Sequence, residues 1–234
     1  MSDRLKMPDT RQFCDKVFTR GVWEKHGRKQ TRGFAEHFHK HVKVPLSRFS
    51  MLDMGCALGD SLPVWKRNYP NARLAACDVS EVAIKRCQAE YGRIAECFVG
   101  TFEQIEGLWD VIYCSNVLEH FEEHIDIARA LLSHCSLLYV LTPFNELQDG
   151  SMLYRGASGG FPHVATFYRN SFDSLIKGGD ASRIDTLIFS APGAWGHSKL
   201  KRVLLAAHRA FVAKPLFQEP LQIAYTIHRR LSWI

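Results

Sequence analysis

Acidic and histidine residues stand close to the ends of several apolar runs in this chain. Asp53 and Asp78 each end such a run, and the first is followed at once by a turn rich in small residues. A carboxylate accepts two hydrogen bonds, which suits the paired hydroxyls of a ribose. His120 and His163 come later, and histidine is the usual general base near neutral pH. These residues predict a nucleotide-like ligand beside a site of proton transfer.

Apolar runs that alternate with helical patterns predict the elements that position these residues. We expect strands at 49–54, 73–77, 95–99, 110–114, 136–141, 184–189 and 221–229. We expect helices at 62–68, 81–91, 103–106, 122–133 and 169–177. This alternation is typical of an α/β fold with an open, mostly parallel sheet covered on both faces, which binds ligands at the carboxyl ends of its strands. We expect the last strand to be antiparallel.

Changes in composition divide the chain into two predicted parts. Residues 1–45 are basic and form a helical N-terminal extension or cap, and residues 46–234 form the ligand-binding domain. Within that domain, 145–165 is glycine-rich and predicts a lid loop. Residues 197–214 combine basic and apolar side chains and predict a basic helix. Such a helix makes a weak peripheral membrane contact or docks against the domain, and we favour docking.

The overall composition predicts a folded cytoplasmic protein. Apolar residues make up 46% of the 234 residues, and the formal net charge is +6. This charge suits an acceptor or partner that carries phosphate or carboxylate groups. The seven cysteines form no C-x-x-C pair, which indicates reduced thiols. No signal peptide and no membrane-spanning stretch is expected. The oligomeric state stays open.

Five short motifs occur in an order that resembles a known enzyme family. They are Leu52-Asp53-Met54-Gly55-Cys56, Asp78-Val79-Ser80, Trp109-Asp110-Val111-Ile112, Asn116-Val117-Leu118-Glu119-His120 and Leu141-Thr142-Pro143. Together they resemble the class I S-adenosylmethionine-dependent methyltransferases. The match is to the branch with Leu-Glu-His after the fourth strand, which includes ubiquinone-pathway O-methyltransferases and sugar or natural-product tailoring enzymes. The resemblance implies a Rossmann-like, doubly wound, seven-stranded sheet, with S-adenosyl-L-methionine as cofactor and S-adenosyl-L-homocysteine as product.

The same resemblance implies a set of cofactor contacts. Those assigned to the methionyl part and the methyl group are Asp53, Gly55, Cys56, Ala57, Gly59, Ser115 and Asn116. Those assigned to the ribose and adenine are Asp78, Val79, Thr101 and Phe102. The chain departs from the family at Ala57, which replaces the middle glycine of the turn, and at Thr101, which replaces the acid that meets the adenine amine.

Two histidines are candidates for the catalytic base. His163 follows the glycine-rich loop and is preferred slightly over His120, although a structural role is open for both. From the lid, Tyr154, Arg155 and Tyr168 are weaker candidates for substrate contact. The run His37, His39 and His41 is interpreted as a solvated helix face, because only the first and last of the three share a face and no matching carboxylate follows. We therefore expect no metal site.

These features predict methyl transfer to an oxygen, with nitrogen the second choice, of a small metabolite or a sugar in glycan or natural-product biosynthesis. Two other hypotheses stay open. One is an assembly protein that binds S-adenosylmethionine without catalysis, and the other is an RNA methyltransferase, which the basic charge favours. Against nucleic acid as substrate, the chain has Asn116-Val117-Leu118-Glu119 where base methyltransferases carry a Pro-Pro-Tyr type of motif.

Overall fold

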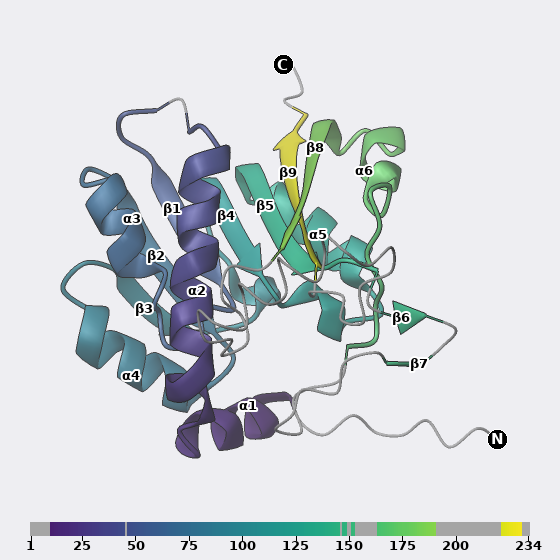
Figure 1. The fold of residues 1–234 in the computed structure, drawn as a ribbon. Helices are drawn as coiled ribbons and strands as arrows, with labels where there is room; N and C mark the ends of the chain where they lie inside the picture. The colour runs from purple at the N-terminus through teal and green to yellow at the C-terminus, as the bar shows by residue number, and fades with distance from the viewer. Residues whose placement is uncertain are drawn as a thin grey trace, which may run out of the picture.

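A seven-stranded sheet forms the centre of the protein (Figure 1). The computed structural model describes residues 10–44, 46–145, 147–148, 151–152, 163–190 and 221–230. The strands are β1 (Ser50–Met54), β2 (Arg73–Asp78), β3 (Glu96–Val99), β4 (Trp109–Ser115), β5 (Cys135–Pro143), β8 (Ala181–Ser190) and β9 (Leu221–Arg229). Their order is β3-β2-β1-β4-β5-β9-β8, with β9 antiparallel to both of its neighbours. The doubly wound, mostly parallel sheet with an antiparallel last strand is confirmed.

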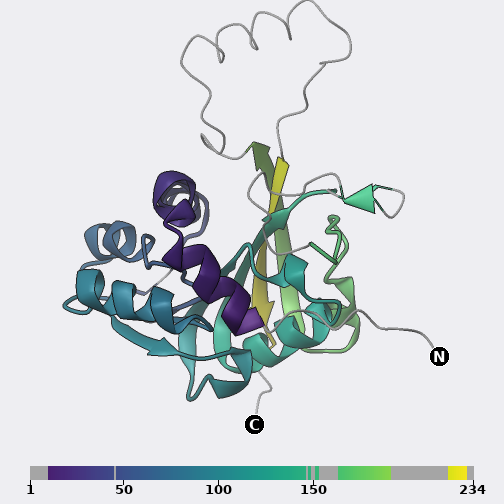
Figure 2. The ribbon, with the colours of Figure 1, turned by 90° about the horizontal axis from the view of Figure 1, so that it is seen from below.

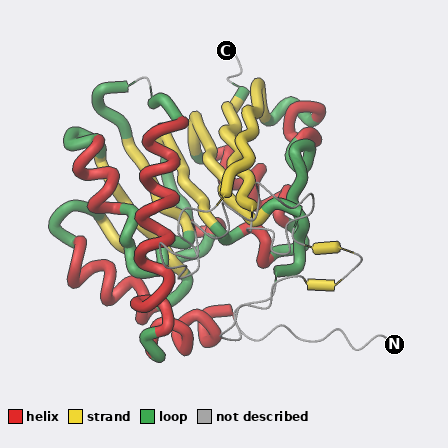
Figure 3. The backbone as a smooth tube through the Cα atoms, viewed as in Figure 1, coloured by secondary structure: helices red, strands yellow, loops and turns green. Residues whose placement is uncertain are grey.

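Helices cover both faces of this sheet (Figure 3). One face packs against α2 (Val22–His41), α3 (Leu62–Asn68) and α4 (Glu81–Tyr91). The other packs against α5 (His124–Ser133) and α6 (Asp173–Lys177). Because both faces are covered, the central strands are buried along almost their whole length, and their sequences are continuous apolar runs.

The helical N-terminal extension is present and lies against the domain. Its first helix, α1 (Thr10–Thr19), contacts α4 and crosses the edge where the parallel strands end (Figure 2). Phe18 packs with Ala57 and Leu58 of the turn after β1. The extension therefore covers part of the edge at which a ligand of this fold would bind.

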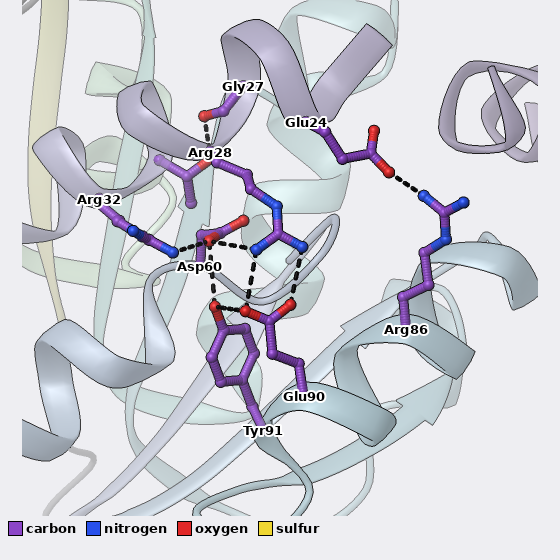
Figure 4. Close-up of polar contacts among 9 residues, drawn as sticks. Glu24, Gly27, Arg28, Arg32, Asp60, Arg86, Glu90 and Tyr91 are labelled. Atoms are coloured by element: carbon purple, nitrogen blue, oxygen red, sulfur yellow. Dashed lines mark hydrogen bonds and ion pairs between the residues drawn. The ribbon is translucent and has the colours of Figure 1, made fainter. Parts of the chain in front are cut away.

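A buried aspartate fixes α2 over the same turn (Figure 4). The Asp60 side chain has no solvent exposure and accepts hydrogen bonds from Arg32, at 2.8 Å, and from the Tyr91 hydroxyl, at 3.2 Å. Arg28 lies 3.5 Å from the same oxygen and forms a two-bonded ion pair with Glu90. Since a buried charge must be paired, this network ties the N-terminal extension to the turn and to α4.

Close packing leaves no room for a side chain at Gly59, in the turn after β1. Gly59 has φ 77°, and a Cβ there would lie 2.4 Å from the Cys87 sulfur of α4. We expect Gly59→Ala to lower the free energy of unfolding by about 2–5 kcal/mol, from backbone strain and overpacking together. Chemical denaturation measures this change. Gly107→Ala is the matched control, because Gly107 has φ 71° but no atom within 4 Å of the added Cβ. Equal losses in the two variants would contradict the packing explanation.

Several predicted elements differ from the structure. The helix expected at 169–177 begins only at Asp173, because Ser171 and Asp173 donate backbone bonds to Tyr168 and Asn170 in preceding turns. The helix expected at 103–106 is a short 3-10 turn, η1 (Phe102–Gln104). In the predicted lid, β6 (Leu147–Gln148) pairs with β7 (Ser151–Met152). The basic helix expected at 197–214 lies outside the described residues.

The interpretation of the histidine run on α2 as a solvated face is wrong for His37. Its ring stacks on Phe189 at 3.5 Å between centroids, and its Nδ1 lies 3.3 Å from the Tyr139 hydroxyl. Burial lowers the pKa of His37 to about 4, so this side chain packs as a neutral ring on the sheet.

Two other expectations can be compared with the described residues. All seven cysteines are free thiols, as predicted. None of the described helices combines the length and the apolar character needed to cross a bilayer.

Candidate functional site

The carboxyl ends of β1, β2 and β4 lie side by side and form the base of the site. Met54 pairs with Cys77 of β2 and with Cys114 of β4. The turn after β1 closes back on β2, because the N–H groups of Gly55 and Cys56 both donate to the Cys77 carbonyl oxygen, at 2.9 and 3.0 Å. The parallel register thus brings together residues far apart in the sequence.

Asp78 lies at the end of β2 with its carboxylate directed at the turn. One carboxylate oxygen accepts from the Ala57 N–H and the other from the Ser80 N–H, both at 2.9 Å. Burial raises the pKa of Asp78, and these N–H groups oppose the rise. Each oxygen keeps a second lone pair, and the residue is 7% exposed. The free acceptor positions suit the two donating hydroxyls of a ribose at the exposed edge of this carboxylate.

The first helix contacts the surroundings of Asp78. The Asp15 carboxylate on α1 accepts from the Ser80 hydroxyl and, at 3.3 Å, from the Val82 N–H at the start of α4. Cys14 is close enough for the negative charge of Asp78 to help burial in raising the pKa of its thiol. Since α1 carries both residues, its position is coupled to that of the β2 end.

Most of the turn after β1 is buried in protein packing. Cys56, Ala57 and Gly59 are buried, whereas Gly55 is half-buried and has φ 76°. A Cβ on Gly55 would lie 2.3 Å from Cγ2 of Val117, which follows β4. The turn therefore presents Gly55 and backbone groups to a ligand, rather than a row of side chains.

Asp53 lies beneath this turn, and the pKa of its carboxyl group is higher than usual for an aspartate. Its carboxylate accepts from the Ser61 hydroxyl, and burial raises its pKa to about 7, with a further rise from the charge of Asp78. Asp53 therefore keeps its proton to a higher pH than an exposed aspartate does. The structure places this residue against Ser61 instead of at an open surface.

The pKa of Asp53 makes stability depend on pH. In the unfolded chain this proton leaves near pH 4, whereas the folded protein keeps it to about pH 7. Asp53 therefore adds most to the free energy of unfolding at low pH. As the pH rises toward 7 this contribution falls, by up to about 1.4 kcal/mol per pH unit. We expect Asp53→Asn to remove this slope. Denaturant unfolding of both proteins at pH 5, 6 and 7 measures it, and parallel pH profiles would contradict the assignment.

The predicted adenine residues follow β2, in the case of Val79, and β3, in the case of Thr101 and Phe102. Val79, Thr101 and Phe102 are half-buried at this edge. The Thr101 hydroxyl accepts from the Glu103 N–H at 3.4 Å, and Gln104 Oε1 accepts from the Thr101 N–H at 2.8 Å. The sequence did not lead us to expect this role for Gln104, although the Thr-x-x-Gln spacing is the signal of a capping box.

The end of β4 leads directly to the candidate bases. Ser115 and Asn116 are half-buried, and the Asn116 amide donates to the Ser115 hydroxyl at 3.1 Å. Asn116 has φ 54°, which turns the chain sharply into η2 (Leu118–His120). The strand end is thereby connected to His120 within a few residues.

The two candidate histidines come together although 42 residues separate them in the sequence. The ring centroids of His120 and His163 are 4.9 Å apart, with the rings inclined by 64°. The Glu119 carboxylate completes the cluster, and ligand atoms of all three side chains lie within 4.8 Å of one another. The chain is held there because the N–H groups of Val164 and Ala165 donate to the Glu119 carbonyl oxygen at 2.7 and 3.1 Å.

Of the three substrate residues predicted from the lid, the structure describes Tyr168. Tyr168 is exposed, and its carbonyl oxygen accepts from the Tyr225 hydroxyl. Tyr154 and Arg155 lie outside the described residues.

Comparisons with known proteins agree with this geometry. Residues 52–138 match a family described as a methyltransferase domain. No curated protein sequence matches the chain. A putative methyltransferase in complex with the Haloferax volcanii Trm112 methyltransferase activator superposes with a TM-score of 0.67 at 10% identity, over 97% of this chain and all of the other.

Two further similar structures contain SAH. The plantazolicin methyltransferase BpumL, with SAH and a monoazolic desmethylPZN analogue, is 20% identical over 95% of this chain and 91% of its own, with a TM-score of 0.55. Magnesium protoporphyrin IX methyltransferase from Synechocystis PCC 6803, with SAH, is 14% identical over 93% of this chain and 97% of its own, with a TM-score of 0.57. Residues 52–138 are therefore similar to a methyltransferase domain, and the chain shares its fold with methyltransferases solved with SAH.

Proposed function

We propose that this protein transfers a methyl group from S-adenosylmethionine to an oxygen, with nitrogen the second choice, of a small metabolite or a sugar in glycan or natural-product biosynthesis. The observation that carries the choice of oxygen is the pairing of His120 and His163 beside the β4 end. A hydroxyl must lose its proton to become a good nucleophile, and a histidine near its pKa removes protons efficiently at neutral pH.

The cofactor contacts follow from the strand ends. Asp78 would hold the ribose diol, Val79 and Phe102 would flank the adenine, and Gly55 would let the methionyl part approach the backbone. Ser115 and Asn116 would lie under the sulfur. The bound cofactor supplies a methyl group on a positively charged sulfur, which needs no further activation.

The acceptor must still be aligned with the methyl group and lose its proton, and residues on the acceptor side of the site would do this. With the cofactor bound, this side of the site would align the acceptor hydroxyl with the methyl group, so that the acceptor oxygen could take the methyl group as the sulfur leaves with the electron pair. The hydroxyl proton passes to His163, our preferred base, with His120 as the neighbouring ring. Residues 1–45 act as a cap, and 145–165 as a lid that shields the acceptor from water.

The acceptor class stays a proposal because similar folds serve different acceptors. Besides the two enzymes above, coclaurine N-methyltransferase has the same fold, with a TM-score of 0.61 at 13% identity over 85% of this chain and 72% of its own. Fold alone does not determine substrate. A small-molecule or glycan acceptor is our choice over RNA, and a cytoplasmic location is part of the same proposal.

Two measurements test the function. Calorimetry with S-adenosylhomocysteine measures cofactor binding, and a screen with radiolabelled S-adenosylmethionine measures transfer to hydroxylated metabolites, sugar nucleotides, amines and RNA. We expect binding and transfer to a hydroxyl. Binding without transfer to any class would favour the non-catalytic assembly protein. Transfer to RNA, with an affinity that falls steeply as salt rises, would favour the RNA enzyme.

A further inference from the structure

We propose that Glu119, His120 and His163 bind a divalent first-row transition metal ion, such as Zn²⁺, beside the methyl-transfer site. The three side chains offer one carboxylate oxygen and two imidazole nitrogens, and these atoms lie within 4.8 Å of one another. Two imidazoles with one carboxylate form a donor set that such ions prefer, and three protein ligands leave positions open for an acceptor.

The fold holds these ligands in place before any ion arrives. Glu119 and His120 are consecutive residues of η2, whose start is fixed by the turn at Asn116. His163 directly precedes Val164 and Ala165, whose N–H groups bind the Glu119 carbonyl oxygen. The ligand from the distant segment is therefore tied to the backbone of the other two, which lowers the entropy lost on binding.

Burial and charge favour a cation at this position. Glu119 is 1% exposed, and a buried carboxylate is costly unless positive charge lies close to it. The two histidine rings are inclined by 64° instead of being stacked, so the edge of one ring faces the other. A cation held by the carboxylate and the two imidazoles would carry charge opposite to that of Glu119.

A metal ion here would change the role of the histidines in the proposed function, on which this inference rests. A bound divalent ion lowers the pKa of an oxygen ligand, so an acceptor hydroxyl at an open position would lose its proton near neutral pH. His120 and His163 would then act as ligands instead of bases. The sequence led us to expect no metal, because only the histidine run on α2 was considered as a ligand set and it has no matching carboxylate.

Zinc binding to the chelator-stripped full chain tests this site without cofactor or acceptor. We expect isothermal titration with ZnCl2 to show one ion per chain. Loss of any one ligand should weaken the affinity by more than about 100-fold, since even outer-shell changes cost about 10–100-fold. The variants are Glu119→Gln, His120→Ala and His163→Ala, and circular dichroism checks that each is folded.

The matched control is His41→Ala. His41 and His37 form a second pair of neighbouring rings, 4.3 Å between centroids, but among the described residues this pair belongs to no cluster of three metal-ligating side chains. We expect His41→Ala to bind zinc like the unmodified chain. No binding, or binding that the three cluster variants retain and His41→Ala loses, would overturn the proposal. Calorimetry with S-adenosylhomocysteine on the same preparation separates this outcome from a failure of the methyltransferase function.

Discussion

His163→Ala is expected to slow methyl transfer by about 10²- to 10⁴-fold, the usual contribution of a positioned acid–base group. The loss should appear in kcat, measured with radiolabelled S-adenosylmethionine and the acceptor found in the screen. The affinity for S-adenosylhomocysteine should stay the same, because the proposed cofactor contacts at Gly55 and Asp78 come from other elements. We expect this loss of kcat whether His163 removes the proton itself or binds a metal ion that lowers the pKa of the acceptor hydroxyl.

The control for this variant is His134→Ala. His134 follows α5, where its Nδ1 lies 3.0 Å from the Gly107 carbonyl oxygen, and its own carbonyl oxygen accepts from Trp109 at the start of β4. It is therefore at the opposite edge of the sheet, and we expect full activity. Normal turnover in His163→Ala would remove this residue from the mechanism and leave the role to His120.

Asp78→Asn is expected to weaken S-adenosylhomocysteine binding by about 10- to 100-fold, or about 1.4–2.8 kcal/mol, the scale for hydrogen bonds to a charged group. The amide keeps the size of the side chain but loses the charge and one acceptor for the ribose diol. Because the carboxylate also accepts from Ala57 and Ser80, some loss of stability is expected too. Titration calorimetry on the folded variant measures the affinity directly.

Asp110→Asn provides a matched comparison. Asp110 also accepts from a backbone N–H and a hydroxyl, both of Ser50, at 2.7 and 2.9 Å. It lies near the opposite, amino-terminal end of the strands, so its loss affects stability without touching the ligand. Equal affinity of Asp78→Asn and the unmodified chain would overturn the ribose assignment.

The sheet was largely predictable because its signals are local. Every predicted strand exists within a few residues of its expected bounds. The central strands were the clearest, since a strand buried on both faces must be a continuous apolar run. The helices of the first half were equally clear, with Glu81–Tyr91 confirmed to the residue. Short turns such as η1 were placed less well, because capping side chains and not periodicity determine them.

The sequence predicted which elements carry the site residues, but it did not predict which of these residues lie in contact. The positions of Asp78, Ser115 and His120 at strand ends follow from sequence order, whereas the coverage of the turn by α1 depends on Phe18 and Asp15 meeting distant partners. The approach of His163 to His120 depends on backbone bonds to the Glu119 carbonyl oxygen. No local pattern encodes such long-range contacts.

The pairing at the tip of the last two strands has an evolutionary consequence. Ser190 pairs with Leu221, and the Phe144 N–H donates to the Leu221 carbonyl oxygen, close to Phe167 of the segment that carries His163. Residues 191–220 therefore begin and end beside each other at one end of the β8–β9 pair. A change in the length of this segment would leave every described strand register intact, so the scaffold tolerates evolutionary variation between these two anchors.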